Sequence, residues 1–150
     1  MGIPTRISDF KNRIRTGFHS AEEYDRAKQQ ALERVLGPMH GYVGHAIIPY
    51  EIGGPVDMYY FPQPDGGTAF ATMELLGFDG KQPAKSDVGT YELVAFTRHA
   101  VVVPDSSALF DAIEQRLRII FTNIGRYSEQ AVLNSGDTAE VPVGDNEPNA

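Results

Sequence analysis

Apolar residues recur at helical spacing in two long segments of the chain. The first segment begins with the capping box Ser20 and Glu23 and ends at Gly37-Pro38, and its apolar stripe is Tyr24, Ala27, Ala31 and Val35. This pattern predicts a helix over residues 21–36. The second segment opens with Pro104-Asp105-Ser106-Ser107 and stops at Gly125, with the stripe Leu109, Ile113, Leu117, Phe121 and Ile124. It predicts a helix at 107–124, and a shorter stripe within residues 1–18 indicates a short amphipathic helix there.

Between these helices the pattern changes to short runs rich in β-branched and aromatic residues, which predict strands at 45–48, 56–61, 68–76 and 90–103. Residues 63–67, Gln-Pro-Asp-Gly-Gly, predict a hairpin turn between the second and third strands. Alternation along the third strand places Glu74 on the face opposite Met73. A further short strand is expected near Leu133. The elements together predict a single α+β domain with a mainly antiparallel sheet and flanking α-helices, which we expect to cover one face.

Composition excludes several classes of protein. The chain has 150 residues, 41% of them hydrophobic, so one domain can bury a substantial core. It contains no cysteine, which excludes disulfides, a thiolate nucleophile and cysteine-ligated zinc. No apolar run approaches the roughly 20 residues of a membrane span, and the N-terminus lacks the pattern of a signal peptide. We therefore expect a cytoplasmic protein without a membrane partner.

The charge of the chain is unevenly distributed. The net charge is −7, yet residues 1–18 carry four basic side chains against Asp9 alone. After Arg126 every charged residue is acidic. This balance disfavours nucleic acid and favours a basic protein partner, although negative charge also serves solubility. We assign residues 1–19 to a basic N-terminal segment, 20–143 to the domain and 144–150 to a mobile tail.

Six residues are candidates for contact with a partner protein. A purely structural interpretation explains the carboxylates inside apolar strand runs least well, and tyrosine is enriched at protein interfaces. The candidates are Asp57, Tyr59, Glu74, Tyr91, Glu92 and Asp137. For Asp57 and Glu92 we expect adjacent strands, with hydrogen bonds to backbone amides or basic side chains.

Motifs for catalysis and for cofactors are weak. Asp57, Glu74 and Glu92 permit a carboxylate pair of the kind hydrolases use, but strand carboxylates are more often solvated or paired with arginine. The spacing of His40 and His45 offers too few ligands for zinc. The chain has no Gly-x-Ser-x-Gly elbow, Gly-x-Gly-x-x-Gly motif or P-loop. We therefore predict no catalytic residues, no metal and no cofactor.

Several pieces in a fixed order carry a resemblance to a known family. They are L-E-R-V-L-G, I-I-P-Y-E-I-G-G-P, V-D-M-Y-Y-F-P, T-M-E-L-L-G, Y-E-L-V-A-F and L-N-S-G-D-T-A-E-V-P. Over residues 20–143 the chain resembles the Suppressor-of-fused-like domain. The family's animal members clasp a peptide of a transcription factor, and its bacterial members look like immunity proteins of polymorphic toxin systems. The resemblance implies a non-catalytic protein-binding module of the bacterial immunity or inhibitor type, whose partner is a protein such as a basic toxin domain.

Two alternatives from other classes stay open at this point. One is a domain that binds a small ligand or a peptide at a face or edge of the sheet, which a closed apolar pocket would favour. The other is a hydrolase that uses Asp57 and Glu92, which would require the two carboxylates to converge in a cleft.

Overall fold

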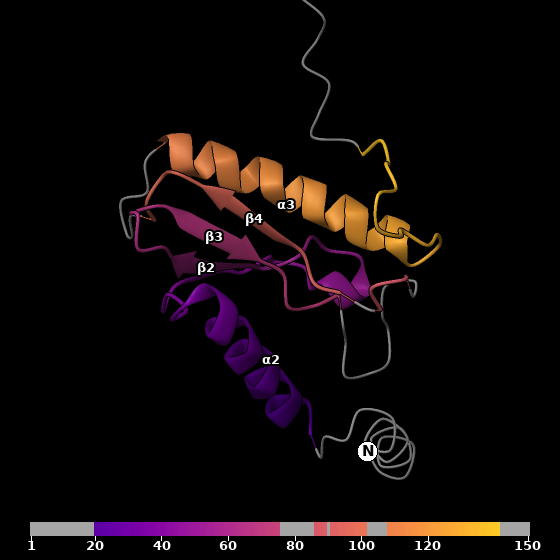
Figure 1. The fold of residues 1–150 in the computed structure, drawn as a ribbon, viewed down its shortest axis with the longest axis horizontal. Coiled ribbons are helices and arrows are strands. Elements are labelled where there is room, and N and C mark those ends of the chain that lie inside the picture. Colours follow the sequence, from indigo (N-terminus) through magenta and orange to yellow (C-terminus); the bar gives the residue numbers. More distant parts are fainter. Residues whose placement is uncertain (1–19, 76–85, 90, 102–107, 142–150) are drawn as a thin grey trace, which may run out of the picture.

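The computed structural model describes residues 20–75, 86–89, 91–101 and 108–141. Two helices flank a four-stranded antiparallel sheet in a single α+β domain, which confirms the predicted fold class (Figure 1). The strands lie in the order β1-β2-β3-β4. Their bounds are Val43–Gly44 for β1, Met58–Pro62 for β2, Thr68–Ala71 for β3 and Val94–Thr97 for β4. The helices are α2, Ala21–Leu36, and α3, Ala108–Ser128, with a short 3-10 helix, η1, at Tyr50–Ile52.

The local signals for α2 and for the β2–β3 hairpin are confirmed. Ser20 Oγ accepts a hydrogen bond from the Glu23 backbone N–H at 3.1 Å, and Gly37 ends the helix with φ of 86°. In the hairpin the Gln63 N–H donates to the Gly67 carbonyl at 2.9 Å, and Gly66 adopts φ of 91°. Glycine is favoured at such a left-handed position because it has no Cβ.

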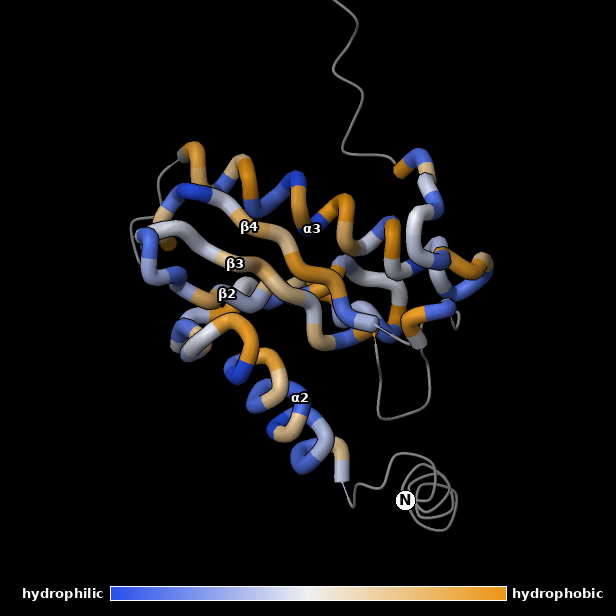
Figure 2. The backbone as a smooth tube through the Cα atoms, in the orientation of Figure 1, coloured by the Kyte–Doolittle hydropathy of each residue, from blue (hydrophilic) through white to orange (hydrophobic). Residues whose placement is uncertain are grey.

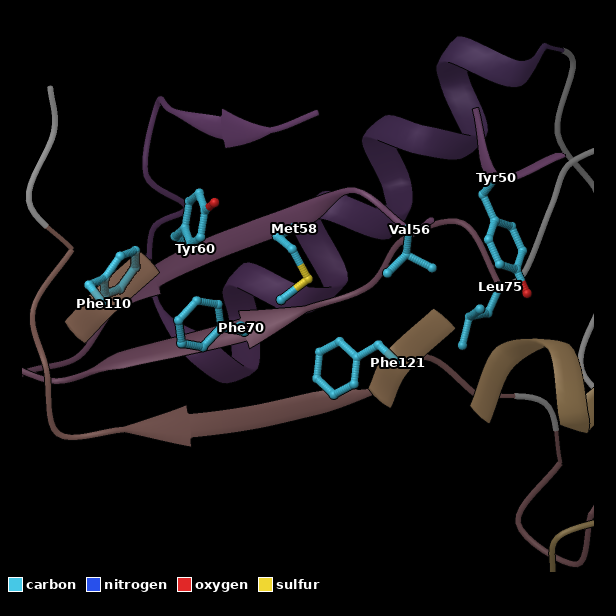
Figure 3. Close-up of a cluster of buried hydrophobic side chains, with 8 residues drawn as sticks. All are labelled: Tyr50, Val56, Met58, Tyr60, Phe70, Leu75, Phe110 and Phe121. Atoms are coloured by element: carbon cyan, nitrogen blue, oxygen red, sulfur yellow. The ribbon is translucent and has the colours of Figure 1, made fainter. Parts of the chain in front are cut away.

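The two helices cover opposite faces of the sheet, so the expectation of a single covered face is wrong. On one face α3 packs over a core that includes Met58, Tyr60 and Phe70. Figure 3 shows its side chains in a row, from Phe110 and Tyr60 at one end to Tyr50 and Leu75 at the other. On the other face α2 contributes Leu36 to a smaller cluster built on Phe61, Ala69 and Ala71.

The physical reason is that the central strands are apolar on both sides. All four residues of β3 are buried, and in β2 Tyr60 and Phe61 point to opposite faces and are both buried. Figure 2 shows apolar and polar residues alternating along α3, whereas α2 is mostly hydrophilic and becomes apolar at its sheet end. A sheet that is apolar on both faces needs a layer on each of them.

The strands are shorter than predicted. The third ends at Ala71. The Thr72 N–H still donates to the Leu93 carbonyl at 3.0 Å, but the Leu93 N–H donates to Thr72 Oγ1 rather than to a backbone carbonyl. The first comprises only residues 43–44, so 45–48 is loop, and of the predicted 90–103 only 94–97 is strand in the part that the structure describes.

Helix α3 runs past its predicted stop. It continues through Gly125 to Ser128. A Cβ at Gly125 would lie 2.6 Å from the Tyr50 hydroxyl and from Leu75 Cδ2, so the glycine serves close packing rather than termination. Residues 129–141 contain no strand, although one was predicted near Leu133. The predicted N-terminal helix and the tail 144–150 fall outside the described residues.

Candidate protein-interaction site

Asp57 hydrogen-bonds across the two ends of the loop that joins β1 to β2. Its Oδ1 accepts a hydrogen bond from the Ala46 N–H at 2.7 Å, and its Oδ2 lies 2.8 Å from His45 Nδ1. Its own backbone N–H donates to Glu74 Oε2 at 2.9 Å. The Asp57 side chain is only 16% exposed. The Asp57 side chain thus bonds to the start of the loop, and its backbone N–H bonds to Glu74 in the bend after β3.

Glu92 joins α2 to the ends of β3 and β4. Its Oε1 accepts from Lys28 Nζ at 2.9 Å, and the two side chains are 8% and 10% exposed. Its Oε2 accepts from Thr72 Oγ1 at 2.7 Å and from the Leu75 N–H at 3.3 Å. Lys28 Nζ also donates to the Met73 carbonyl at 2.6 Å. A buried carboxylate needs such partners, and here the fold supplies them.

The expectation for Asp57 and Glu92 is therefore confirmed in part. Both bond to backbone amides, and Glu92 pairs with a lysine, as predicted. They do not lie on adjacent strands, because Asp57 precedes β2, Glu92 precedes β4, and β3 lies between these strands.

Glu74 is the carboxylate of this cluster whose pKa is shifted. Burial, together with the neighbouring Asp57 and Glu92 carboxylates, raises the pKa of Glu74 to about 7, although the Asp57 N–H bond lowers it. Burial first, and then the charges of Glu74 and Asp57, raise the pKa of the Tyr59 hydroxyl. Four of the six predicted residues, Asp57, Tyr59, Glu74 and Glu92, are thus brought together.

The other two predicted residues differ, since Tyr91 directly precedes Glu92 of this cluster and Asp137 lies in a separate turn. Tyr91 is half-buried, and its buried hydroxyl has no hydrogen-bond partner among the residues that the structure describes. Asp137 is exposed and accepts a bond from the Asn134 N–H at 2.8 Å. The turn of residues 134–137 contacts the segment 86–89, because the Ser135 N–H donates to Asp87 Oδ1 at 2.8 Å.

The segment that sequence reasoning missed is the loop of residues 45–57, which we call the isoleucine loop. Ile47, Ile48 and Ile52 on it are 101%, 54% and 75% exposed. The run 45–48, which contains Ile47 and Ile48, was predicted to be a strand, and Ile52 lay outside every predicted element. The contrary signal was the flanking Pro49 and Gly53-Gly54-Pro55, because proline and glycine disfavour a continuous ladder.

A second exposed apolar surface lies on β4, which forms one edge of the sheet. Among the described residues β4 pairs with β3 alone. Val94 and Phe96 are 40% and 66% exposed, and they alternate with Ala95, which packs toward the α3 core. A hollow beside Phe96 extends to the β2–β3 hairpin, and its lining includes Pro64 and Arg98.

Within the described ranges, no group of three or more His, Asp or Glu side chains is arranged to hold a metal ion. No helix in those ranges is both long and apolar enough to cross a membrane. Comparison of the chain with protein-family models, with curated proteins and with solved structures found no match. The resemblance to the Suppressor-of-fused-like domain stays a prediction.

Proposed function

We propose that this chain is a non-catalytic protein-binding module whose partner is a protein with a basic contact surface. The resemblance described above suggests the immunity or inhibitor type, with a polymorphic toxin domain as the partner. The observation that carries the proposal is the edge strand β4 with exposed Val94 and Phe96. An edge strand offers unpaired backbone groups to an added strand, and alternate side chains supply specificity.

The charge of the protein supports a basic partner. Net charge is −7, and the described residues after Arg126 include Glu129, Asp137 and Glu140, all exposed. Complementary charge mainly accelerates association, so higher salt should slow association and change dissociation less. The carboxylates of the cluster hold the loop and α2 in place, and their contribution to binding is through that positioning.

The test is isolation of a partner from the native host, followed by association kinetics at low and high salt. Phe96→Lys should weaken the complex about tenfold or more, because lysine blocks strand addition and repels a basic surface. The matched control is Val132→Lys, at a residue that is 50% exposed and follows α3. Turnover of a small-molecule substrate at ordinary enzymatic rates, or an unchanged affinity of Phe96→Lys, would contradict the proposal.

A further inference from the structure

We propose that the isoleucine loop is a second, preformed docking surface, and that it fits a protein surface with an apolar centre and a margin of lysine or arginine. This inference rests on the proposed function, because it assumes a protein partner. It concerns a different part of the molecule from β4, since the loop joins β1 to β2 and β1 and β4 are opposite edges of the sheet.

The first step is that the fold does not need these isoleucines. None of Ile47, Ile48 and Ile52 belongs to either core cluster, and each exposes more than half of its surface. Scattered apolar residues are ordinary on a surface, but here three exposed isoleucines lie within residues 47–52 of one loop. Removing such side chains from water contributes about 25 cal/mol per Å² of apolar area.

The second step is that the loop is held rigidly at several points. Asp57 fastens its base, as described above, and the Val56 N–H donates to Thr122 Oγ1 on α3 at 3.1 Å. The Arg126 guanidinium donates to the carbonyls of Tyr50 and Gly54 and lies 3.7 Å from the centre of the Tyr50 ring. Arginine over an aromatic face adds a cation–π attraction. A loop fixed in this way loses little conformational entropy on binding.

Inside the loop the backbone is packed tightly. The Gly54 N–H donates to the Pro49 carbonyl at 3.0 Å, and a Cβ at Gly54 would collide with the carbonyl of Ile48. The glycine therefore permits the turn that brings the two halves of the loop together. Ile48 and Ile52 are presented from a closed turn rather than from an open chain.

The third step is the charge around the isoleucines. Glu51 is exposed between Ile48 and Ile52, and Glu129, 41% exposed, lies 3.2 Å from the Tyr50 hydroxyl. Arg126, a cation beside the loop, already binds loop carbonyls and Glu129. A partner with lysine or arginine at its margin complements this rim. An anionic membrane surface or a second copy of the same face would be repelled by it.

The probe is a short helical peptide of leucine and lysine, compared with a leucine and glutamate peptide of the same pattern. We expect the lysine peptide to bind with amide shifts centred on residues 46–54, and the glutamate peptide to bind at least about tenfold more weakly. Ile47→Lys and Ile52→Lys should each reduce affinity for the lysine peptide about tenfold, with circular dichroism unchanged because both side chains are exposed.

Two controls keep the result specific. Val35→Lys changes an aliphatic residue that is 81% exposed on α2, and Phe96→Lys changes the β4 surface. Neither should alter binding of the lysine peptide. Equal binding of both peptides, binding to phosphatidylcholine–phosphatidylserine vesicles, or self-association that Ile47→Lys abolishes would each overturn the inference.

The isolated partner separates this inference from the proposed function. If Phe96→Lys weakens that complex and Ile47→Lys and Ile52→Lys leave it unchanged, the protein binds its partner without the isoleucine loop and the inference fails alone. If no protein partner exists, the proposed function fails, and the peptide comparison still decides the chemistry of the loop.

Discussion

Replacing Glu74 with glutamine should make the protein more stable at neutral and alkaline pH. Glu74 is half-buried beside Asp57 and Glu92, and burial together with these carboxylates raises its pKa to about 7. Its Oε2 accepts the Asp57 N–H, a bond that the carbonyl oxygen of glutamine can also accept. Glu74→Gln therefore removes a negative charge from the cluster and keeps the contact.

The size of the effect follows from linkage. Between 4.5, the ordinary pKa of a glutamate, and about 7, native Glu74 retains a proton that unfolded Glu74 has released. Stability therefore falls as pH rises through this window and levels off above it. Each tenfold change in proton affinity equals about 1.4 kcal/mol, which sets an upper limit of about 3 kcal/mol. Because water still reaches Glu74 and screens its interactions, we expect about 1–2 kcal/mol.

Urea unfolding of both proteins at about pH 4.5 and about pH 8 measures this difference. At the lower pH the two should be nearly equal, and at the higher pH Glu74→Gln should exceed the wild type. Glu51→Gln, at an exposed glutamate on the isoleucine loop, is the control and should show no such pH-dependent gain. A stability difference that is equal at both pH values, or a variant that is weaker at about pH 8, would refute the reasoning.

Three further predictions concern packing, pairing and capping, and urea unfolding tests each of them. Gly125→Ala should destabilise by about 1–2 kcal/mol, because its Cβ would lie 2.6 Å from the Tyr50 hydroxyl; the gain of about 1 kcal/mol usual for alanine in an open helix would contradict this. Lys28→Met should lose about 2–4 kcal/mol by removing the buried partner of Glu92, and Glu92→Gln added to it should recover part; strictly additive losses would count against the pairing. Ser20→Ala should lose about 1 kcal/mol, with Ser20→Gly less affected, and no loss would rule out the cap.

Local signals in the sequence predicted local structure well. The Ser20 cap, the Gly37 stop and the Gly66 turn depend on neighbouring residues, and the structure confirms all three. The clustering of Asp57, Glu74 and Glu92 was less accessible. It depends on the bend after Ala71, which removes Glu74 from the ladder and directs it toward the backbone of Asp57. Alternation along a presumed longer strand could not show that bend.

The burial of both faces of the sheet also could not be predicted from the hydrophobic pattern of the strands. A run such as Tyr59-Tyr60-Phe61 fits a sheet with one covered face and one solvent-exposed face that includes some apolar residues. It fits a sheet with two covered faces equally well. The difference depends on where α2 docks, and that position is set by contacts distant in sequence, such as Lys28 with Glu92. Gly125 illustrates the same limit, because a glycine that packs and a glycine that ends a helix look identical in a sequence.

The predictions for the strand carboxylates and for the apolar run at 45–48 had different outcomes. Asp57 and Glu92, predicted to be structural or to face a partner, accept hydrogen bonds from backbone amides, and Glu92 also pairs with Lys28. Ile47 and Ile48, which were expected to be strand residues, lie in a loop and are exposed to solvent. The two outcomes meet in one loop, because the Asp57 carboxylate bonds to His45 and Ala46, which directly precede Ile47. A carboxylate inside an apolar run can thus indicate a nearby backbone N–H that needs an acceptor, and an apolar run that is followed by proline and glycine can be an exposed loop rather than a strand.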